Sequence, residues 1–448
     1  MEQALGPALT TESPDLACYA FDASGHASLP HAVALPTRVE QVSQVLRICH
    51  EHKIPVYPRG AGTGTTGAAI ALRPGLLLGL TKMCKIIDIS TEDLTAVVEP
   101  GVITGDLQRE VARRGLFYPP DPASKDFCTI GGNVATGAGG ATAVKYGVTR
   151  DYVMALEIVL PGGKVVHAGA KTAKGVVGYD IVRLFVGSEG TLGIATKIWL
   201  KLLVAPETVG TLGAFFSNEK EAGRAVVSLF KAGILPRCAE LLDRGSLELV
   251  KDMMPFKAPQ GARAMVVSEV DGFKETIQSQ MNRVTSVFKD CGAQSVMAAK
   301  NKEEAERIWS ARRSLSPAIR RLGFSGKISE DICVPRHSLP EMIEAVYDLS
   351  KEAGIKIVCF GHAGDGNLHI NVLFDKESRE DQKKVSKLIP EIMRLTVRFG
   401  GTISGEHGVG LTKKEFLGLE IGADELHIMK GIKKLFDPHS IMNPGKVF

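Results

Sequence analysis

The sequence contains eight cysteines but no C-x-x-C pair. Iron–sulfur clusters and zinc fingers depend on such spacings, so neither is expected within this chain. The cysteines stand singly in a chain that is not expected to be exported, and most of them should be reduced and buried. They are Cys18, Cys49, Cys84, Cys128, Cys238, Cys291, Cys333 and Cys359.

The chain also lacks any apolar run near the roughly 18 residues that a membrane span needs. Lys and Arg number 54 and Asp and Glu number 50, and a net charge of +4 is too weak to predict binding to nucleic acid or to an anionic membrane. Residues 1–15 lack a basic segment followed by an apolar core, so no secretory signal is predicted. We therefore expect a cytoplasmic protein, peripheral to a membrane only through a partner.

Glycine, in contrast, is abundant, with 48 among 448 residues. Apolar residues make up 44% and charged residues 23%, as in ordinary soluble globular proteins, and the length suits two or three domains. The glycines cluster at 60–67, 131–140, 187–193, 361–366 and 400–410. Such clusters indicate close approaches of the backbone rather than flexible linkers.

The first half of the chain is predicted to form short strands separated by turns. Apolar residues recur at helical spacing over residues 38–52, which predicts an amphipathic helix there. Thr104 is expected to cap a helix that ends at Gly115. Strands are predicted at 54–58, 75–80, 85–89 and 95–101, with a hairpin at 155–169 and further strands within 184–203.

From about residue 205 onward, strands alternate with long helices. Strands are predicted at 210–216, 238–244, 262–270, 328–334 and 355–361. Helices are predicted at 218–232, 273–291, 302–322, 338–353 and 376–399. This pattern indicates an α+β domain in which helices cover one face of an antiparallel sheet.

Two glycine-rich segments carry the most distinctive chemistry, Gly361–His369 and Gly405–Gly408. His362 and His369 could meet across a bend that the intervening glycines allow, and Glu406 would add a carboxylate. Such ligands suit one divalent metal ion, with Zn²⁺ favoured and Mn²⁺ or Fe²⁺ as alternatives, and three ligands leave positions open for substrate. The competing interpretation is that both histidines are core residues.

Two further side chains in these segments need a role. Asp365 could be a metal ligand, but a carboxylate between glycines can instead accept from the amides of its own turn, and we favour the turn. His407 directly follows Glu406, and adjacent residues of an extended segment are poorly placed to be ligands together. Because imidazoles exchange protons near neutral pH, His407 is predicted to be a catalytic base.

The first glycine loop satisfies the G-x-G-x-x-G spacing from Gly62 to Gly67, with Asp88 about twenty residues on. A dinucleotide fingerprint of this kind opens a helix, whereas here Pro74 follows within seven residues of Gly67 and a strand comes next. We therefore interpret the loop as a nest of backbone N–H groups for a pyrophosphate, to which Arg59 could add a charge. A purely structural loop is the alternative.

Several motifs occur in order along the chain: Pro58–Thr65 (PRGAGTGT), Pro120–Ser124 (PDPAS), Gly131–Asn133 (GGN) and Gly187–Ile194 (GSEGTLGI). The series resembles the FAD-binding domain of the vanillyl-alcohol oxidase type. With the two histidine-bearing segments and the ending Asn443–Lys446 (NPGK), it resembles the FAD-linked D-2-hydroxyacid dehydrogenases. That family includes D-lactate dehydrogenase, D-2-hydroxyglutarate dehydrogenase and the D subunit of glycolate oxidase. The resemblance covers residues 30–448.

The resemblance implies an α+β fold with three parts. A two-part FAD-binding domain would span 1–205, a substrate (cap) domain with an antiparallel sheet and the metal site 206–420, and a C-terminal segment, 421–448, would pack back on the FAD-binding domain. Many relatives attach flavin covalently through a histidine of the first loop, but Thr63 stands there, so we expect non-covalent FAD. The implied FAD contacts are Pro58, Arg59, Gly60, Ala61, Gly62, Thr63, Gly64, Thr65, Pro122, Gly131, Gly132, Asn133, Gly139, Glu189, Gly190, Ile194 and Asn443.

The resemblance also implies a set of substrate contacts. Arg312 matches the position that binds the substrate carboxylate, and Ser316, where relatives often have threonine, shares its helix face one turn on. Lys327 matches a second carboxylate-binding position, and Asn371 matches a polar contact. Without the resemblance, the Arg-rich helix at 312–321 would be interpreted as a solvated surface.

The activity implied by the resemblance is oxidation of a D-2-hydroxyacid to the 2-oxoacid, with hydride transfer to flavin N5. The metal would bind the substrate hydroxyl and one carboxylate oxygen and lower the pKa of the alcohol, and His407 would remove the hydroxyl proton. D-lactate is favoured because no dedicated group for a second carboxylate is identified. Glycolate and D-2-hydroxyglutarate are alternatives, and Arg313, Arg320 or Lys356 could serve a larger substrate.

Electrons from reduced FAD must leave the chain, because it has no cysteine pattern for a cluster. An iron–sulfur subunit, an electron-transfer flavoprotein, a quinone and oxygen are all open as acceptors, as are a homodimer and a hetero-complex. One rival function is a non-catalytic FAD-binding subunit of an electron-transfer complex, which would be expected to lose the metal ligands or the base. Another is a metal-free flavin oxidase of sugars or phenols, which needs neither histidine segment.

Overall fold

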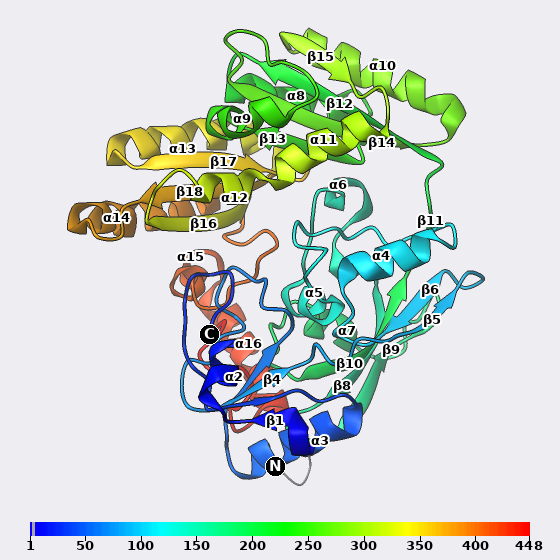
Figure 1. Ribbon diagram of the computed structural model, residues 1–448, viewed down its shortest axis with the longest axis vertical. Coiled ribbons are helices and arrows are strands. Elements are labelled where there is room, and N and C mark those ends of the chain that lie inside the picture. The colour runs from blue at the N-terminus through cyan, green and yellow to red at the C-terminus, as the bar shows by residue number, and fades with distance from the viewer. Residues whose placement is uncertain (2–4) are drawn as a thin grey trace. The chain divides into compact units, whose positions relative to one another are not determined.

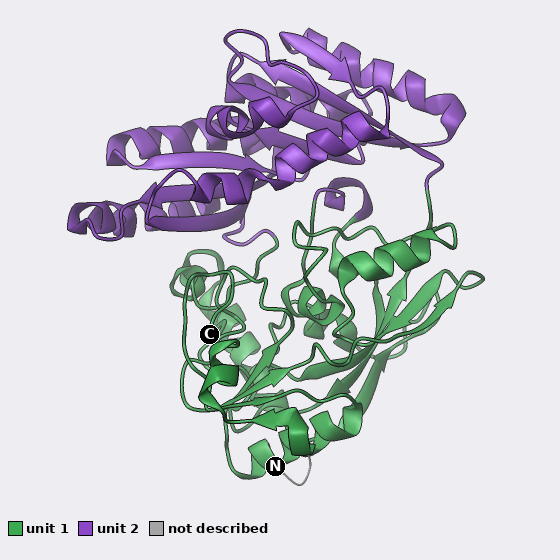
Figure 2. Cartoon of the chain, in the orientation of Figure 1, with its two compact units in different colours: residues 1–140, 147–205, 406–448 green, residues 141–146, 206–405 purple. Residues whose placement is uncertain are grey.

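The computed structural model describes residue 1 and residues 5–448 (Figure 1). It contains two compact units, coloured separately in Figure 2. Unit 1 comprises Met1–Gly140, Gly147–Ala205 and Glu406–Phe448, and unit 2 comprises Ala141–Tyr146 and Pro206–Gly405. The three-part division predicted above, with its boundary at residue 420, stays a prediction. The stretch without a predicted secretory signal includes residues 2–4, which lie outside the described part of the chain.

Unit 1 contains two larger sheets and one two-stranded sheet. The first has the order β1 (Leu9–Thr10), β2 (Ala32–Ala34), β4 (Leu76–Gly79) and β3 (Val56–Arg59). Its last three strands are parallel. The amphipathic helix predicted at 38–52 is confirmed as α3 (Val39–Glu51), whose apolar face packs on β3 and β4.

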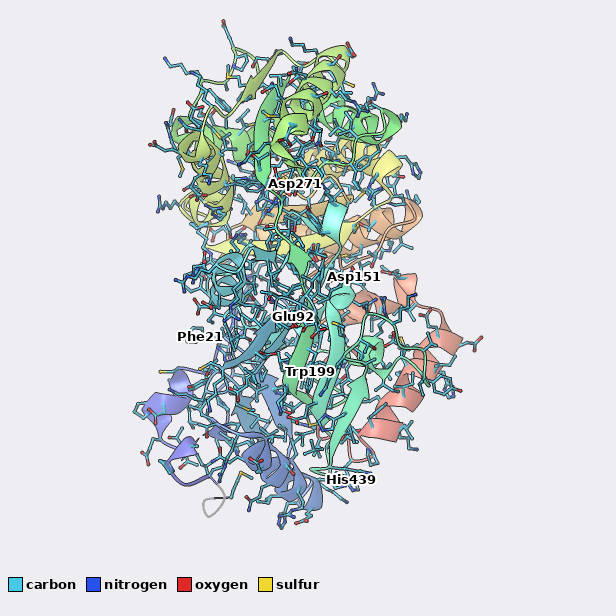
Figure 3. All side chains as sticks on the ribbon, turned by 90° about the vertical axis from the view of Figure 1, so that its right-hand side faces the viewer. Phe21, Glu92, Asp151, Trp199, Asp271 and His439 are labelled. Atoms are coloured by element: carbon cyan, nitrogen blue, oxygen red, sulfur yellow. The ribbon has the colours of Figure 1, made fainter. Side chains whose placement is uncertain are left out.

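The second sheet of unit 1 is antiparallel. Its order is β5 (Ile86–Ser90), β6 (Thr95–Val98), β10 (Ile194–Lys201), β8 (Val153–Val159) and β9 (Val165–Gly169). The hairpin predicted at 155–169 is confirmed by the pairing of β8 with β9. Burial alternates along β10, so Ile198 and Leu200 face the core while Trp199, which is labelled in Figure 3, belongs to the opposite face.

Further helices and one strand pair complete unit 1. They are α2 (Ser13–Ala17), α4 (Thr104–Ala112), α5 (Ile130–Thr136), α7 (Ile181–Phe185), α15 (Leu417–Glu420), α16 (Ala423–Phe436) and the pair β7 (Leu116–Phe117) and β11 (Leu203–Val204). The predicted helix cap at Thr104 is wrong, because Ile103 is the residue before the helix. The Thr104 hydroxyl instead accepts a hydrogen bond of 2.7 Å from the Asn133 side chain, which ties α4 to α5.

Unit 2 is built on a seven-stranded antiparallel sheet. The order is β15 (Ser295–Ala298), β12 (Thr208–Phe216), β14 (Ala264–Gly272), β13 (Cys238–Leu242), β17 (Lys356–Gly361), β18 (Asn367–Phe374) and β16 (Gly326–Cys333). The helices are α6 (Ala143–Tyr146), α8 (Glu219–Lys231), α9 (Arg244–Val250), α10 (Lys274–Asp290), α11 (Lys302–Arg313), α12 (Leu315–Arg320), α13 (Leu339–Ala353) and α14 (Arg379–Arg398). Among the residues described, no helix has both the length and the apolar character to cross a membrane.

Helices cover both faces of this sheet, so the prediction of helices on one face is wrong. Phe215 and Phe216 are neighbours on β12 and point to opposite faces. Phe215 belongs to an apolar cluster with α9, α11 and α12. Phe216 packs edge-on against Phe288 of α10. Residues 210–216 of β12 are all buried for the same reason, because a strand covered on both sides has no solvent-exposed face.

The single helix predicted at 302–322 is divided into α11 and α12 at Ser314. Pro317 explains the division, because proline has no N–H to donate and its ring clashes with the carbonyl four residues earlier, that of Arg313. The first helix therefore ends at Arg313. This break places Arg312 in the last turn of α11.

A short detour of the chain, residues 141–146, belongs to unit 2 although its flanks belong to unit 1. Asp271 at the end of β14, labelled in Figure 3, anchors it. The Tyr146 hydroxyl donates to Asp271 at 2.7 Å, and the Lys145 ammonium pairs with the same carboxylate. Arg237 Nη1 donates at 3.0 Å to Oδ2, the oxygen that also accepts from Tyr146. A buried carboxylate with three donors fixes α6 onto the sheet.

Candidate active site

One face of the unit 2 sheet carries the predicted substrate and metal residues. Leu373 of β18 belongs to the apolar cluster beneath α11 and α12. Alternate residues of a strand share a face, so Asn371 and His369 point to the same side. The neighbouring strands pair His369 with Phe360 of β17 and with Asp331 of β16. Buried polar groups therefore continue the apolar core toward the turn between β17 and β18.

The turn at residues 361–367 brings His362 close to His369. Gly366 has φ +85°, and a Cβ there would lie 1.9 Å from the Val334 carbonyl oxygen, so only glycine fits. The two imidazole rings have centroids 5.1 Å apart and planes at 88°. The structure thus brings together the two imidazoles that were predicted to meet across a glycine bend.

Glu240 of β13 lies between the predicted substrate arginine and the predicted metal ligand. Its Oε2 accepts from Arg312 Nε at 2.8 Å and lies 2.7 Å from Arg312 Nη2. Its Oε1 lies 2.5 Å from His362 Nδ1. The guanidinium also lies over the Phe360 ring, 4.5 Å from the centroid, which adds a cation–π contact. Arg312 is therefore a buried, oriented cation and not part of a solvated helix face.

Glu240 is ionised at neutral pH although it is fully buried, with 0% of its surface exposed. Burial alone would raise the pKa of its carboxyl, but the charges and hydrogen bonds of His362 and Arg312 outweigh that effect and lower the pKa. An ionised carboxylate only accepts hydrogen bonds, so His362 Nδ1 must carry a proton and donate it. When the imidazole gives up its other proton, as binding to a metal requires, the lone pair is on Nε2.

Lys327 and Ser316 lie side by side, as two contacts to one substrate group would require. The Lys327 ammonium donates to the Ser316 hydroxyl at 3.0 Å. Burial, and secondarily the charge of Arg320, lowers the pKa of Lys327 to about 8. Lys327 is therefore a desolvated cation that loses its charge in the mildly alkaline range.

Asn371 is fully buried, and its amide group already has protein partners. Its Nδ2 donates to the carbonyls of Val358 at 3.2 Å and His369 at 3.3 Å. Its Oδ1 accepts from the Ser329 hydroxyl at 3.1 Å. These bonds tie β16, β17 and β18 together, so a direct contact of Asn371 with substrate stays a prediction.

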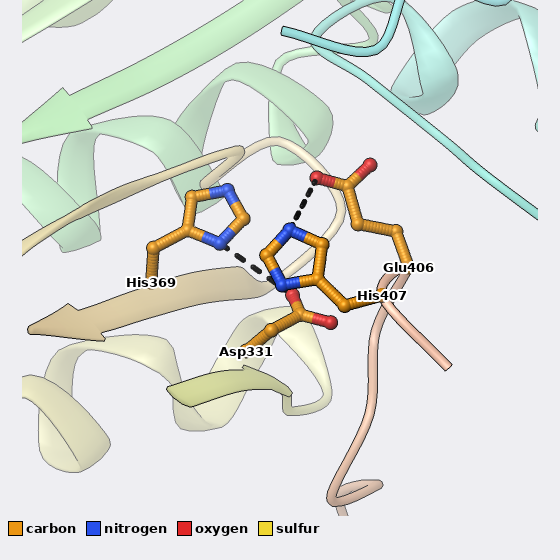
Figure 4. A group of neighbouring side chains, drawn as sticks. All are labelled: Asp331, His369, Glu406 and His407. Atoms are coloured by element: carbon orange, nitrogen blue, oxygen red, sulfur yellow. Dashed lines mark ion pairs between the residues drawn. The ribbon is translucent and has the colours of Figure 1, made fainter. Parts of the chain in front are cut away.

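Four side chains form a group with the composition of a metal site: Asp331, His369, Glu406 and His407 (Figure 4). Each offers one ligand atom, and these atoms all lie within 4.8 Å of one another. His369 Nδ1 lies 3.5 Å from Asp331 Oδ1, and His407 Nε2 lies 4.0 Å from Glu406 Oε1. The group includes two of the three predicted ligands, Glu406 and His369. It adds Asp331 and the predicted base His407, and it omits His362.

Asp365 has the contact expected of a turn residue. Its Oδ1 accepts from the backbone amide of Asn367 at 3.4 Å, two residues further along the turn. Such a bond is typical of an aspartate that stabilises its own bend. The neighbouring Asn367 instead donates to Asp331 Oδ1 at 2.7 Å and so orients that carboxylate.

In unit 1, the first glycine loop follows β3 and contains no helix before β4. The context of a dinucleotide fingerprint is therefore absent, as predicted. Of the predicted cofactor residues, Gly60 to Thr65 lie in this loop, Pro122 lies in the turn before α5, and Gly131, Gly132 and Asn133 lie in α5. Arg59 is buried, and its Nη2 donates to the Phe21 carbonyl at 2.8 Å.

The C-terminal Asn-Pro-Gly-Lys segment is hydrogen-bonded to the end of this loop. Asn443 Nδ2 donates to the carbonyls of Ala68 at 3.0 Å and Glu189 at 2.7 Å. The Lys446 ammonium donates to the carbonyl of Ile70 at 2.8 Å, and to that of Gly67. Three motifs that lie far apart in the sequence therefore converge in unit 1.

Glu189 holds the segment after His407 in place. Its carboxylate accepts from the amides of Val409 at 2.7 Å and Gly410 at 2.8 Å. Burial raises the pKa of this carboxyl, and the two backbone hydrogen bonds partly offset the effect. Glu189 itself has φ 51°, a conformation that few non-glycine residues adopt.

Three other predicted cofactor residues have structural contacts in unit 1. Gly190 touches Pro58, since a Cβ at 190 would lie 2.8 Å from Pro58 Cγ. Gly139 lies against Glu406, because a Cβ at 139 would lie 2.8 Å from Glu406 Oε2. Ile194 lies in the apolar core of the first sheet. A direct contact of each with the cofactor stays a prediction.

Known families match most of this chain. Residues 205–447 match the family described as FAD linked oxidases, C-terminal domain, and residues 30–169 match the FAD binding domain family. The chain belongs to the FAD-linked oxidases. It is thus an FAD-binding oxidoreductase, as the motif series predicted.

Individual relatives agree with this assignment. Glycolate oxidase subunit GlcD of Bacillus subtilis is 42% identical over 431 residues, which cover 96% of this chain and 92% of the relative. D-lactate dehydrogenase of Anaerostipes hadrus is 37% identical over 93% of this chain and 89% of its own length. Among solved structures, p-cresol methylhydroxylase with bound substrate aligns with a TM-score of 0.80 at 20% identity, over 100% of this chain and 95% of that one. The predicted vanillyl-alcohol oxidase-type fold is confirmed.

The first loop of this FAD-linked oxidase fits a phosphate-bearing cofactor. Thr65 Oγ1 and Arg59 Nη1 are buried, and neither has a hydrogen-bond partner among the described residues. Buried donors without partners are costly, so a ligand that accepts from them would remove the penalty. FAD supplies such acceptors in its pyrophosphate.

Sequence reasoning missed Glu240 and Asp331 of the FAD-linked oxidase. Both are acidic residues at strand positions that are fully buried. A signal was present, because Glu240 interrupts the apolar run Cys238–Leu242 and Asp331 precedes the apolar end of β16. A charged residue at a buried strand position requires a charged or hydrogen-bonding partner.

Proposed function

We propose that this FAD-linked oxidase oxidises a D-2-hydroxyacid to the 2-oxoacid, with D-lactate as the favoured substrate. The observation that carries the proposal is the chain of contacts Arg312–Glu240–His362 on one face of the unit 2 sheet. These contacts place the buried Arg312, which can bind a substrate carboxylate, next to the imidazole of His362, which can bind a metal. The names of the relatives, D-lactate dehydrogenase and glycolate oxidase subunit, support the same substrate class.

The roles of the residues follow from their chemistry. Arg312 binds the substrate carboxylate, since a guanidinium can grip it with two parallel hydrogen bonds. Lys327 and Ser316 supply a second cation and a hydroxyl donor for the same group. His407 takes the proton of the substrate hydroxyl. Bound FAD supplies the acceptor for the hydride that leaves C2.

We further propose one divalent metal ion, with Zn²⁺ favoured, bound by His362, His369 and Glu406. Two of these ligands, His369 and Glu406, belong to the group at Asp331, and imidazole and carboxylate donors fit such an ion. When bound, the metal polarises the substrate hydroxyl. Asp331 would orient His369, as carboxylates behind metal-bound histidines do. We propose non-covalent FAD because Thr63 has no nucleophile comparable to a histidine ring.

An anaerobic flavin-bleaching screen with purified holoenzyme tests the proposal. Both enantiomers of lactate and of 2-hydroxyglutarate, and glycolate, are mixed with the oxidised enzyme, and flavin absorbance is followed. D-lactate is expected to bleach the flavin and L-lactate is not. Bleaching by the L enantiomers alone, or by none of the acids, would contradict the proposed function.

Glycolate is the second candidate substrate, because the 42% identical relative is a glycolate oxidase subunit. Glycolate has the carboxylate that Arg312 recognises but lacks the methyl group of lactate. The same screen ranks the two by their bleaching rates at equal concentration. If glycolate bleaches the flavin much faster than D-lactate does, glycolate is the substrate and the type of reaction is unchanged.

The affinity for the acid substrate is expected to fall in alkaline solution because of Lys327. Its pKa of about 8 means that the ammonium is charged below that pH and neutral above it. KM should therefore rise above pH 8, approaching about tenfold per pH unit if the charge is essential. Lys327→Arg keeps its charge throughout and should give a flatter KM profile. Equal alkaline slopes in both enzymes would show that Lys327 does not bind the carboxylate.

An external acceptor is proposed to reoxidise the flavin: an iron–sulfur subunit, an electron-transfer flavoprotein or a quinone. The cysteine spacing supports an external acceptor, since the sequence has no C-x-x-C pair that would hold a cluster. Comparing reoxidation of substrate-reduced enzyme by oxygen and by a soluble quinone would separate oxidase from dehydrogenase behaviour.

A further inference from the structure

Glu240 makes polar contact with both halves of the site in unit 2. Its two carboxylate oxygens have different partners: Oε2 faces Arg312, and Oε1 faces His362. The residue is on β13, the central strand of the sheet, and it is shielded from solvent. A rigid strand is a better support for two partners than a loop would be.

The contact with Arg312 sets the plane of the guanidinium. Glu240 engages Nε and Nη2, and the Phe360 ring lies against the guanidinium at 4.5 Å. A guanidinium has five N–H donors, so two contacts with Glu240 leave three, enough for a bidentate bond to an external carboxylate. Arg312 is thereby oriented before substrate arrives, which lowers the entropic cost of binding.

The contact with His362 sets the tautomer of the imidazole. A proton on Nδ1, donated to Glu240, places the lone pair on Nε2, the atom that can bind a metal. A carboxylate behind a metal-bound histidine also raises the basicity of the ligand atom. The Glu240 side chain therefore orients both His362, the proposed metal ligand, and Arg312, the proposed site for the substrate carboxylate.

We propose that Glu240 is a positioning residue that prepares His362 for metal binding and Arg312 for substrate binding at the same time. The inference rests on the proposed function for its substrate half only. It makes a specific prediction: loss of one carboxylate weakens metal binding and substrate binding together, with a smaller effect on the chemical step.

Glu240→Gln is the variant that tests this, because the amide has nearly the same shape but neither the charge nor a second acceptor. Zn²⁺ titration of the chelator-treated enzyme should give a Kd about 10- to 100-fold higher than in the wild type. KM for D-lactate should rise by at least about tenfold while kcat changes less, since the base His407 is untouched.

Glu269→Gln is the matched control. Glu269 is a buried acid on the neighbouring strand β14, and it accepts from Trp309 Nε1 at 2.5 Å and Thr211 Oγ1 at 2.8 Å. Its replacement should lower stability but leave the Kd for Zn²⁺, KM and kcat unchanged. If Glu240→Gln fails to fold, Glu240→Asp keeps the buried charge, and because it is too short to reach both partners it should show the same two losses to a smaller extent.

The outcomes separate the two proposals. Unchanged Zn²⁺ affinity in a folded Glu240→Gln or Glu240→Asp enzyme would overturn the metal half, and unchanged KM would overturn the substrate half. Equal losses in Glu269→Gln would overturn both, because they would reflect general destabilisation. If no hydroxyacid bleaches the wild-type flavin, the proposed function fails, and the Zn²⁺ titration still decides the role of Glu240 toward His362.

Discussion

Replacing His407 by asparagine is expected to lower kcat for D-lactate by about two to four orders of magnitude, the usual contribution of a general base. Asparagine is similar in size and still hydrogen-bonds, but it cannot take a proton. The effect should appear in kcat, because the carboxylate contacts of Arg312, Lys327 and Ser316 are unchanged. Stopped-flow measurement of anaerobic flavin reduction gives the rate of the chemical step directly.

His167→Asn is the control for this variant. His167 is an exposed histidine on β9 of unit 1, and its replacement should leave flavin reduction unchanged. FAD content and Zn²⁺ content are measured for both variants, because His407 belongs to the group that could hold a metal. Flavin reduction at the wild-type rate in His407→Asn would show that another group takes the proton. Slow reduction with lost Zn²⁺ would instead assign His407 as a ligand.

The sequence predicts the elements of this fold well where the periodicity is strong. The helix at 38–52 and the hairpin at 155–169 are examples, because each has a regular apolar pattern and clear turn residues. It fails where the outcome depends on tertiary partners. Thr104 has the chemistry of a helix cap, but its hydroxyl is used by Asn133, which is 29 residues away in the sequence.

The errors in unit 2 have visible causes. The break between α11 and α12 could have been predicted from Pro317 alone. Helices on both faces of the sheet could have been predicted from β12 and β14, whose apolar runs lack the alternation of a half-exposed strand. Which helices take which face depends on chain connections, and these leave no local pattern in the residues.

The candidate site could be predicted only in part from its sequence. His362, His369 and Glu406 can be recognised because they lie in short segments rich in glycine and histidine. Glu240 lies more than a hundred residues before His362 in the sequence, and its partnership depends on the β13–β17 pairing. An acid buried in a strand is visible in the sequence, but its partner is not, since register is fixed by the whole sheet.

Replacing Arg312 by methionine should have the second large effect. Substrate loses its charge-assisted bonds, and truncating such a buried pair typically costs about 2–5 kcal/mol, or roughly 30- to several-thousand-fold in kcat/KM. The enzyme itself should lose about 3–5 kcal/mol of unfolding free energy, because among the described residues the buried Glu240 carboxylate keeps only His362 as a partner. Steady-state kinetics and urea unfolding measure the two effects.

The control and a double variant separate these effects. Arg313→Met removes the neighbouring arginine, whose side chain is 38% exposed and pairs with Glu306 at the surface, so it should cost at most about 1 kcal/mol and leave KM unchanged. Arg312→Met with Glu240→Leu removes both buried charges and should recover much of the lost stability. Substrate affinity should stay low in that double variant, since no guanidinium faces the carboxylate. Recovery of KM together with stability would show that Arg312 supports the fold and does not bind substrate.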